Sequence, residues 1–205
     1  MLSLKELTTY FQEIGADDVK HSSKTYLAHA IGVYNDLKKW GWDEGMARIG
    51  LFHSIYGTEY FQGFTLPLER RADIREKIGE TAEQIAYLNC AIARDHFDKE
   101  IKKTSGPFQI HDRFIDQIVG VTDQHFHDLC FLHLCDWIEQ VGRAEAWDYR
   151  RTAYRNLAIH LGGLALDKYD EAFRNAPEQV WFDEYQWPES SLAKMRRDEE
   201  RLEAH

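Results

Sequence analysis

Residues 26–59 read YLAHAIGVYNDLKKWGWDEGMARIGLFHSIYGTE and predict two consecutive amphipathic helices. The first helix is expected over residues 23–40, with Gly41 as its end. Its apolar face is formed by Leu27, Ile31, Tyr34 and Leu37. The second helix is expected to begin at Asp43 as its N-cap and to break at Gly57. Because each helix has one apolar face, we expect the two to pack together in the core.

The same helical periodicity recurs along most of the chain, whereas the alternating pattern of strands is nearly absent, so we expect an all-α protein. Further helices are expected over residues 4–14, 73–78, 81–97 and 123–141, with two or three more that are interrupted at Gly162-Gly163, Pro177 and Pro188. Ser3-x-x-Glu6 and Thr81-x-x-Gln84 have the pattern of capping boxes at helix starts. Residues 61–68 and 102–107 are expected loops, and the charged residues 191–205 are an expected solvated end.

The size and composition of the chain indicate a globular protein with one compact core. Its 205 residues exceed the usual size of one domain and fall short of two, so we expect a single domain over residues 1–205. Hydrophobic residues make up 43% of the chain and aromatic residues 13%, which is more than a disordered protein contains. Cys90, Cys130 and Cys135 lie in apolar helical contexts and are odd in number, which favours buried thiols over a disulfide framework.

The charge and hydropathy patterns argue against two classes of partner. The 25 basic and 35 acidic residues give a net charge of −10, which opposes attraction to nucleic acid and to anionic membranes. No apolar run reaches the roughly 18 residues of a membrane helix, and the N-terminus lacks the features of a signal peptide. We therefore expect a cytoplasmic protein that binds a small molecule. A phosphorylated ligand would need a local basic patch or a metal ion, and the sequence leaves the oligomeric state open.

Three polar residues in apolar helical surroundings are the candidate metal ligands. His29 and His53 belong to the two helices of the opening stretch, each on or beside an apolar face. Taken alone, each is more readily explained as a hydrogen-bonded core histidine. Asp136 lies inside the apolar helix expected over residues 123–141, where a carboxylate must be paired, hydrogen-bonded or bound to metal. Two imidazole nitrogens and one carboxylate oxygen would suit a divalent cation, although sequence spacing does not show that they meet.

Other histidines are better explained without a metal. His125, His127 and His133 are two and six residues apart, a spacing that does not bring them to one face of a helix, so we expect capping or core-edge roles. His111-Asp112 is the only literal His-Asp pair in the chain. It follows Gly106-Pro107 in an expected loop, without an apolar helix before it, and we interpret the pair as a coincidence.

The stretch of residues 26–59 resembles the HD domain of the RelA/SpoT-type hydrolases, which remove pyrophosphate from guanosine tetraphosphate. In that family a histidine after an aromatic-led turn is followed by an apolar helix and then by a helix with the motif ALLHD. The resemblance continues through ADIREKIGETAEQIAYL and LHLCDWIEQV and covers about residues 20–143. It implies an HD-domain-like helical bundle with extra C-terminal helices over about residues 144–205. It also implies that His29, His53 and Asp136 hold a divalent metal, either Mn, Fe or Zn.

Two positions depart from the pattern of that family. Ser54 stands where the family has the aspartate of its motif, and a hydroxyl binds metal more weakly than a carboxylate, so we expect a lower metal affinity. Gly57-Thr58 stands where the family has an acidic pair that positions the attacking water. Glu59 lies one position later and would replace that pair only if the backbone turns at Gly57. Ser54 and Glu59 are therefore candidate catalytic residues, and His96, at the end of the helix expected over residues 81–97, is the third.

The sequence leaves three functions open. The first is a metal-dependent hydrolase of a phosphorylated small molecule or nucleotide. Candidate phosphate contacts are Arg48, Arg70, Arg71 and Arg94, although a solvated helix face explains each of them individually. The second is a non-catalytic small-molecule binding or regulatory module on the same scaffold. The third is an HD-type iron oxygenase or lyase, which needs additional histidines such as His96, beside Asp95. Bound metal would separate the first and third functions from the second.

Overall fold

The structure, a computed structural model, describes residues 2–21, 24–174 and 176–177. These residues are mostly helical, as the sequence predicts. The helices are α1 (Leu4–Glu13), α2 (Tyr26–Lys39), α3 (Glu44–Phe52), a 3-10 turn (Leu68–Arg70), α4 (Arg71–Ile78), α5 (Glu80–Ala91), α6 (Arg94–Glu100), α7 (Asp123–Ala144), α8 (Arg151–Leu161) and α9 (Gly163–Phe173). Two antiparallel hairpins accompany them, formed by β1 (Lys20–His21) with β2 (Lys24–Thr25) and by β3 (Phe108–Asp112) with β4 (Gln117–Val121).

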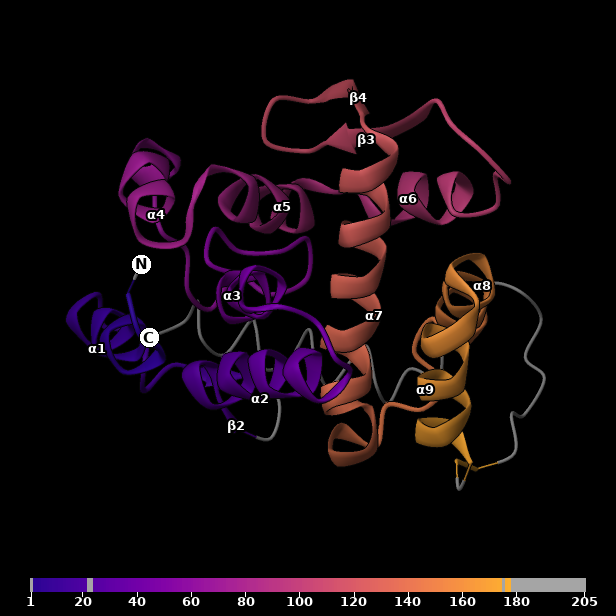
Figure 1. The fold of residues 1–205 in the computed structure, drawn as a ribbon, viewed down its shortest axis with the longest axis horizontal. Coiled ribbons are helices and arrows are strands. Elements are labelled where there is room, and N and C mark those ends of the chain that lie inside the picture. Colours follow the sequence, from indigo (N-terminus) through magenta and orange to yellow (C-terminus); the bar gives the residue numbers. More distant parts are fainter. Residues whose placement is uncertain (1, 22–23, 175, 178–205) are drawn as a thin grey trace, which may run out of the picture.

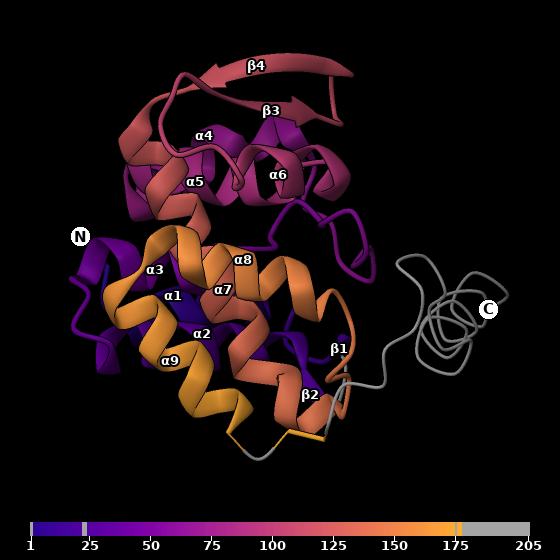
Figure 2. The ribbon, with the colours of Figure 1, turned by 90° about the vertical axis from the view of Figure 1, so that its right-hand side faces the viewer.

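Helix α7 is the centre of this arrangement. Helices α2, α3 and α5 pack against one side of α7, and α8 and α9 pack against the other (Figure 1). Leu129, Leu132 and Cys135 of α7 are fully buried, as the nearly continuous apolar sequence of this helix predicts. Seen after a quarter turn, β3 and β4 lie at the end of the molecule where α7 begins (Figure 2). The fold therefore places the middle of α7, including Asp136, between the two groups of helices.

Side chains at the helix starts fix the first part of the chain. Ser3 and Glu6 form the expected capping box of α1. Thr25 and Asp43 cap α2 and α3, each accepting a hydrogen bond from the backbone amide three residues later. Gly41 follows α2 with φ +89°, a conformation that favours glycine, and so ends the helix where the sequence predicts. These caps set where α2 and α3 begin and end, and thus the depth at which their histidines lie.

A second glycine sets the contact between α2 and α3. A Cβ atom at Gly50 would lie 2.6 Å from Leu37 Cδ1 and 3.1 Å from Val33 Cγ1, and both of these α2 side chains are fully buried. Only a residue without a side chain allows this approach. The carbonyl oxygen of Gly50 also accepts a hydrogen bond of 2.7 Å from Nδ1 of His53. The packing of the two helices therefore also orients a candidate ligand.

The helix expected over residues 81–97 is in fact two helices. Helix α5 ends at Ala91 and α6 begins at Arg94, because the backbone at Ile92 is extended and pairs with Asp112 of β3. This tertiary pairing overrides the local helical pattern. The expected capping box at Thr81-x-x-Gln84 is also wrong, since α5 begins one residue earlier, at Glu80, and no side chain caps it.

The hairpin of β3 and β4 corrects two further expectations. Strands are more frequent than the sequence pattern predicts, and His111-Asp112 lies in β3 rather than in a loop. The Asp112 carboxylate is buried and accepts a hydrogen bond of 2.6 Å from the Tyr87 hydroxyl on α5. Asp112 therefore fastens the hairpin to the helical body, which explains an acidic residue at this position without a metal.

After residue 143 the structure describes two further helices, α8 and α9, with the expected break at Gly162. Pro188 and residues 191–205 lie outside the described residues. Cys90, Cys130 and Cys135 are buried free thiols, as predicted. None of the described helices has both the length and the apolar character that crossing a membrane requires. The single domain over residues 1–205, with its division near residue 143, stays a prediction.

Candidate metal centre

The structure brings the three expected metal ligands together. His29 lies on α2, His53 directly follows α3 and Asp136 lies on α7. All three residues are buried, with exposed fractions of 0%, 1% and 7%. One potential ligand atom from each residue lies within 4.8 Å of the others. The packing of α2, α3 and α7 therefore creates the cluster that the sequence suggests.

The distances between these atoms fit a single divalent ion. His29 Nε2 is 2.9 Å from Asp136 Oδ1 and 3.2 Å from His53 Nε2. His53 Nε2 is 3.4 Å from the same carboxylate oxygen. Ligand atoms bound at roughly 2.0–2.2 Å in tetrahedral or octahedral geometry are separated from each other by roughly 2.8–3.6 Å. The three atoms can thus form one face of a coordination sphere.

Hydrogen bonds at the far side of each imidazole ring point the Nε2 atoms at one another. Nδ1 of His29 lies 2.6 Å from a carboxylate oxygen of Glu139, and Nδ1 of His53 lies 2.7 Å from the carbonyl oxygen of Gly50. Both partners only accept, so each Nδ1 carries the proton. Two Nε2 lone pairs and a carboxylate oxygen at these distances repel one another unless a proton or a metal ion lies between them.

Glu139 is a residue of the site that the sequence reasoning missed. Its side chain is buried and also pairs with Lys24 Nζ at 2.9 Å and with Arg143 Nη2 at 2.5 Å. A Cβ atom at Gly32 would lie 2.2 Å from Glu139 Oε1, so this glycine gives the carboxylate its space beside His29. The signal was available, because Glu139 follows Asp136 by three residues on the same helix and therefore shares its face.

The electrostatics of the cluster favour a cation. Burial lowers the pKa of His29, but hydrogen bonds to Asp136 and Glu139 outweigh burial and raise its pKa to about 9. Burial raises the pKa of Glu139, whereas the hydrogen bonds from His29 and Arg143 bring it down to about 2. The two histidines similarly hold the pKa of Asp136 well below its ordinary value, against the effect of burial. Both carboxylates are therefore anionic, and the space between the three ligand atoms attracts positive charge.

Two buried hydroxyls lie next to this cluster. Ser54 follows His53 directly and is 1% exposed, and its Oγ has no hydrogen-bond partner among the described residues. The Tyr26 hydroxyl is also buried and forms no hydrogen bond of normal geometry with the described residues. It neighbours Ser54 without forming an aligned hydrogen bond, and burial is the main cause that raises the pKa of Tyr26. Because the two hydroxyls neighbour each other, each can serve as the polar partner of the other. The evidence that Ser54 belongs to the site is its position directly after His53.

The other two candidate catalytic residues contact different parts of the structure. The backbone turns at Gly57 with φ +74°, as a role for Glu59 requires. The Glu59 side chain nevertheless accepts a hydrogen bond of 3.1 Å from the backbone amide of Arg94, at the start of α6. His96 lies 3.9 Å from Glu100, on its own helix. Neither residue has a contact with the three ligands in the described structure, and their catalytic roles stay predictions.

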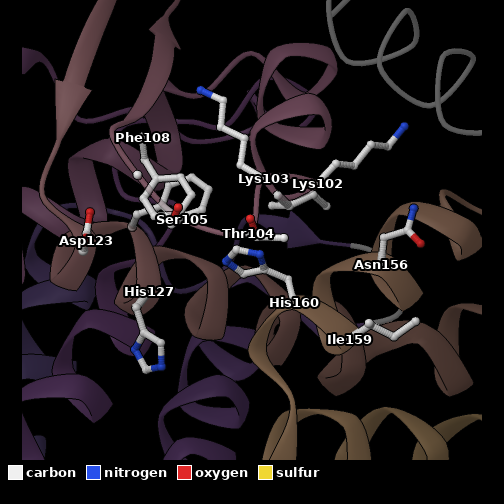
Figure 3. Close-up of a pocket in the computed structure, with 13 residues that line it drawn as sticks. Lys102, Lys103, Thr104, Ser105, Phe108, Asp123, His127, Asn156, Ile159 and His160 are labelled. Atoms are coloured by element: carbon white, nitrogen blue, oxygen red, sulfur yellow. The ribbon is translucent and has the colours of Figure 1, made fainter.

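One hollow of the described surface lies apart from this centre. It has a volume of about 820 Å³ and is lined by the loop between α6 and β3, the start of α7, and α8 (Figure 3). His160 is directed towards Thr104, while Lys102 and Lys103 extend outwards (Figure 3). None of the metal-centre residues lines this hollow. The chemistry of the cluster, rather than the size of a cavity, therefore identifies the candidate site.

The comparisons with known proteins identify no activity. A family model described as a domain of unknown function, DUF6817, matches residues 10–94. This region contains His29 and His53 and ends before Asp136. No curated protein and no solved structure matches the chain.

We predict that Gly32→Ala weakens metal binding without unfolding the chain. The new methyl group would displace the Glu139 carboxylate and leave His29 Nδ1 without its acceptor. The affinity for Zn²⁺ should fall about tenfold or more, because loss of such an outer partner typically costs 10–100-fold. Gly142→Ala on α7 is the matched control, since its methyl group would make only an ordinary contact of 3.6 Å with Trp147. Unchanged Zn²⁺ affinity in Gly32→Ala would show that Glu139 does not support the site.

In protein stripped with EDTA, we predict that His29 stays protonated up to about pH 9. Its pKa in the folded state lies above the ordinary 6.5, so the proton stabilises the fold fully below pH 6.5. This stabilisation is lost as the pH rises through about 9. NMR of the histidine ring protons across this range measures the titration, and His29→Gln assigns the signal. A titration at the ordinary histidine pKa would contradict the described pairing with Asp136 and Glu139.

Proposed function

We propose that this protein is a metal-dependent hydrolase of phosphorylated small molecules, built on an HD-like helical scaffold. The observation that carries the proposal is the buried triangle of His29 Nε2, His53 Nε2 and Asp136 Oδ1, with sides of 2.9, 3.2 and 3.4 Å. Two imidazole nitrogens and one carboxylate oxygen suit Mn²⁺, Fe²⁺ or Zn²⁺. The order of the ligands, His, His and Asp on α2, α3 and α7, supports the HD-like scaffold.

Different residues of this site orient the ligands and set its charge. Glu139 and the Gly50 carbonyl hold the two imidazole rings so that their Nε2 lone pairs converge. The charge of Glu139 is offset by Lys24 and Arg143, so Asp136 is the main anionic group facing the centre. A divalent ion held there would supply Lewis acidity, which offsets charge on a phosphate and makes water a stronger nucleophile. The loaded centre would be positive overall, which favours an anionic substrate.

Ser54 contributes a neutral hydroxyl where an HD site has a carboxylate. Its buried position directly after His53 supports a place beside the ligands. A hydroxyl offers weaker binding than an anionic oxygen, so the three remaining ligands would hold the ion less tightly. We infer that Ser54 orients water or substrate rather than anchoring the ion.

The placement of Glu59 favours a second candidate, a small-molecule binding module without catalysis. Its carboxylate is held at the start of α6 and gives the centre no general base in the described structure. The iron oxygenase or lyase has less support, because His96 lies beside Glu100 and only one three-ligand group occurs among the described residues.

The first test is the metal content of the purified protein together with hydrolysis of a panel of phosphate esters. We predict about one equivalent of a transition metal after exposure to Mn²⁺, Fe²⁺ or Zn²⁺, and phosphate release that EDTA abolishes. His29→Gln and Asp136→Asn should lose the metal and the activity, because each removes one of three ligands. His127→Gln, on an exposed ring of α7, is the control. Metal binding without hydrolysis of any ester contradicts the hydrolase. A wild type without metal contradicts both the hydrolase and the iron oxygenase and favours the binding module.

The second test is Ser54→Asp, which restores the carboxylate of an HD motif. We predict that Mn²⁺ binds at least about tenfold more tightly, which corresponds to a gain of roughly 1.4 kcal/mol from one anionic ligand. The asparagine of Ser54→Asn is nearly the same size as aspartate but carries no charge. This variant should therefore bind Mn²⁺ with an affinity close to that of the wild type. Equal Mn²⁺ affinity in Ser54→Asp and Ser54→Asn would mean that position 54 does not face the ion.

A further inference from the structure

A chain of buried hydrogen bonds runs from the metal centre to a second polar cluster. The side-chain amide of Asn89 donates to the backbone carbonyl of His53 at 2.8 Å, and its oxygen accepts from Nδ1 of His133 at 3.1 Å. Nε2 of His133 accepts from Arg150 Nη1, also at 3.1 Å. His133 lies three residues before Asp136 on α7 and therefore on the same face. The second cluster thus borders the metal centre.

Two buried arginines of this cluster differ in how their charges are balanced. Arg150 forms an ion pair with Asp98 and is also bonded to His133. Arg94 is 8% exposed, and its guanidinium donates to the Tyr149 hydroxyl and lies 4.4 Å from the centre of the Tyr60 ring. No carboxylate of the described residues forms an ion pair with the Arg94 guanidinium.

The guanidinium of Arg94 therefore has unused binding capacity. It carries five N–H donors in a planar fork, and its one described side-chain hydrogen bond leaves most of them available. A buried positive charge is costly without an anionic partner. The fork matches the oxygens of a phosphate, which accept two parallel hydrogen bonds from it. A ligand phosphate would supply the missing partner.

A second unpaired donor lies in the same place. Nε1 of Trp137 is buried without a hydrogen-bond partner among the described residues. Trp137 follows Asp136 in the sequence, and its ring packs 5.0 Å from the ring of Tyr149, the residue that Arg94 contacts. Arg94 and the Trp137 ring thus contact the same tyrosine. Arg94 begins α6, and Tyr149 lies between α7 and α8 in the chain.

The protein carries a net charge of −10, whereas Arg94, Arg113 and Arg150 gather around this cluster. Arg113 is bonded to the backbone carbonyls of Gly57 and Cys90, and Arg150 is paired with Asp98, which leaves Arg94 to meet a ligand. Glu59, Asp98 and Asp112 lie among these arginines, so the region offers a phosphate one guanidinium without an ion pair rather than an extended basic patch.

We propose that Arg94 binds the phosphate group of the substrate and so makes this centre specific for phosphate monoesters of small molecules. The role of Arg94 in hydrolysis rests on the proposed function, whereas the binding of phosphate to Arg94 does not depend on it. Tyr149 holds the guanidinium from one side, and the Tyr60 ring covers one of its faces. Arg94 is thus a residue that touches the substrate and selects it by charge and by the geometry of its fork.

The experiment measures the affinity for inorganic phosphate by calorimetry, with EDTA-treated protein and with Mn²⁺-loaded protein. Arg94→Gln should lower the phosphate affinity about tenfold or more in both forms, because charge-assisted hydrogen bonds are lost. Its affinity for Mn²⁺ should stay within about twofold of the wild type, since no metal ligand changes. Arg151→Gln is the control, because the Arg151 side chain is 17% exposed and already pairs with Asp148 and with the Pro177 carbonyl.

The outcomes separate this inference from the proposed function. Phosphate binding that is equal in wild type and Arg94→Gln, or absent from both forms of the wild type, overturns the role of Arg94. Failure of the wild type to bind metal contradicts the hydrolase, but the metal-free titration still decides the role of Arg94. If Arg94→Gln does not fold, Arg94→Lys decides instead, because it keeps the charge and loses the fork. A loss of about threefold or more supports the proposal, and an unchanged affinity contradicts it.

Discussion

The structure depends on one electrostatic constraint, the close approach of two imidazole nitrogens and a carboxylate oxygen in the buried interior. His29, His53 and Asp136 come from three helices, and their facing atoms lie within 3.4 Å of each other. Such atoms can be held together only by a shared cation, because two lone pairs and an anion repel one another when they are buried. In the metal-free protein, a proton on His29 meets this requirement by joining His29 to Asp136. A divalent ion would meet it by binding His29, His53 and Asp136 together. The fold therefore forms a site that favours a cation at the junction of α2, α3 and α7.

The rest of the fold is arranged to bring these helices close and to fix the rings. Gly50 lets α3 approach the buried Leu37 of α2 and supplies the carbonyl that holds His53. Gly32 gives Glu139 the space to hold His29, while Lys24 and Arg143 balance the charge of Glu139. On the same face of α7 as Asp136, His133 is bonded to Asn89 of α5, and the two side chains link the His53 backbone to the arginine cluster. Metal affinity and phosphate affinity would thus be set by neighbouring parts of the same core.

Much of this could be predicted from the sequence, for reasons that are local. The caps at Ser3 and Asp43 and the end of α2 at Gly41 follow from backbone chemistry that is independent of the rest of the chain. The start of α2 was not predicted as well, because Thr25 caps the helix at Tyr26 rather than at residue 23. Asp136 could be singled out because a carboxylate within an apolar helix needs a partner. The break between α5 and α6 could not be predicted, because it follows from pairing of Ile92 with Asp112, twenty residues later. Arg94 is one of four candidate phosphate contacts in the sequence, but its lack of an ion pair among the described residues could not be predicted, because it depends on how α6 meets Tyr149 and Tyr60.

The most direct test of the central claim is a crystal structure of the protein soaked with Mn²⁺ or Zn²⁺, with the ion located by anomalous scattering. The account predicts one strong peak that lies roughly 2.0–2.2 Å from His29 Nε2, His53 Nε2 and an Asp136 carboxylate oxygen, with Glu139 still bonded to His29 Nδ1. A structure without a peak at this position, in which His29 and Asp136 remain joined at hydrogen-bond distance under saturating metal, would contradict it.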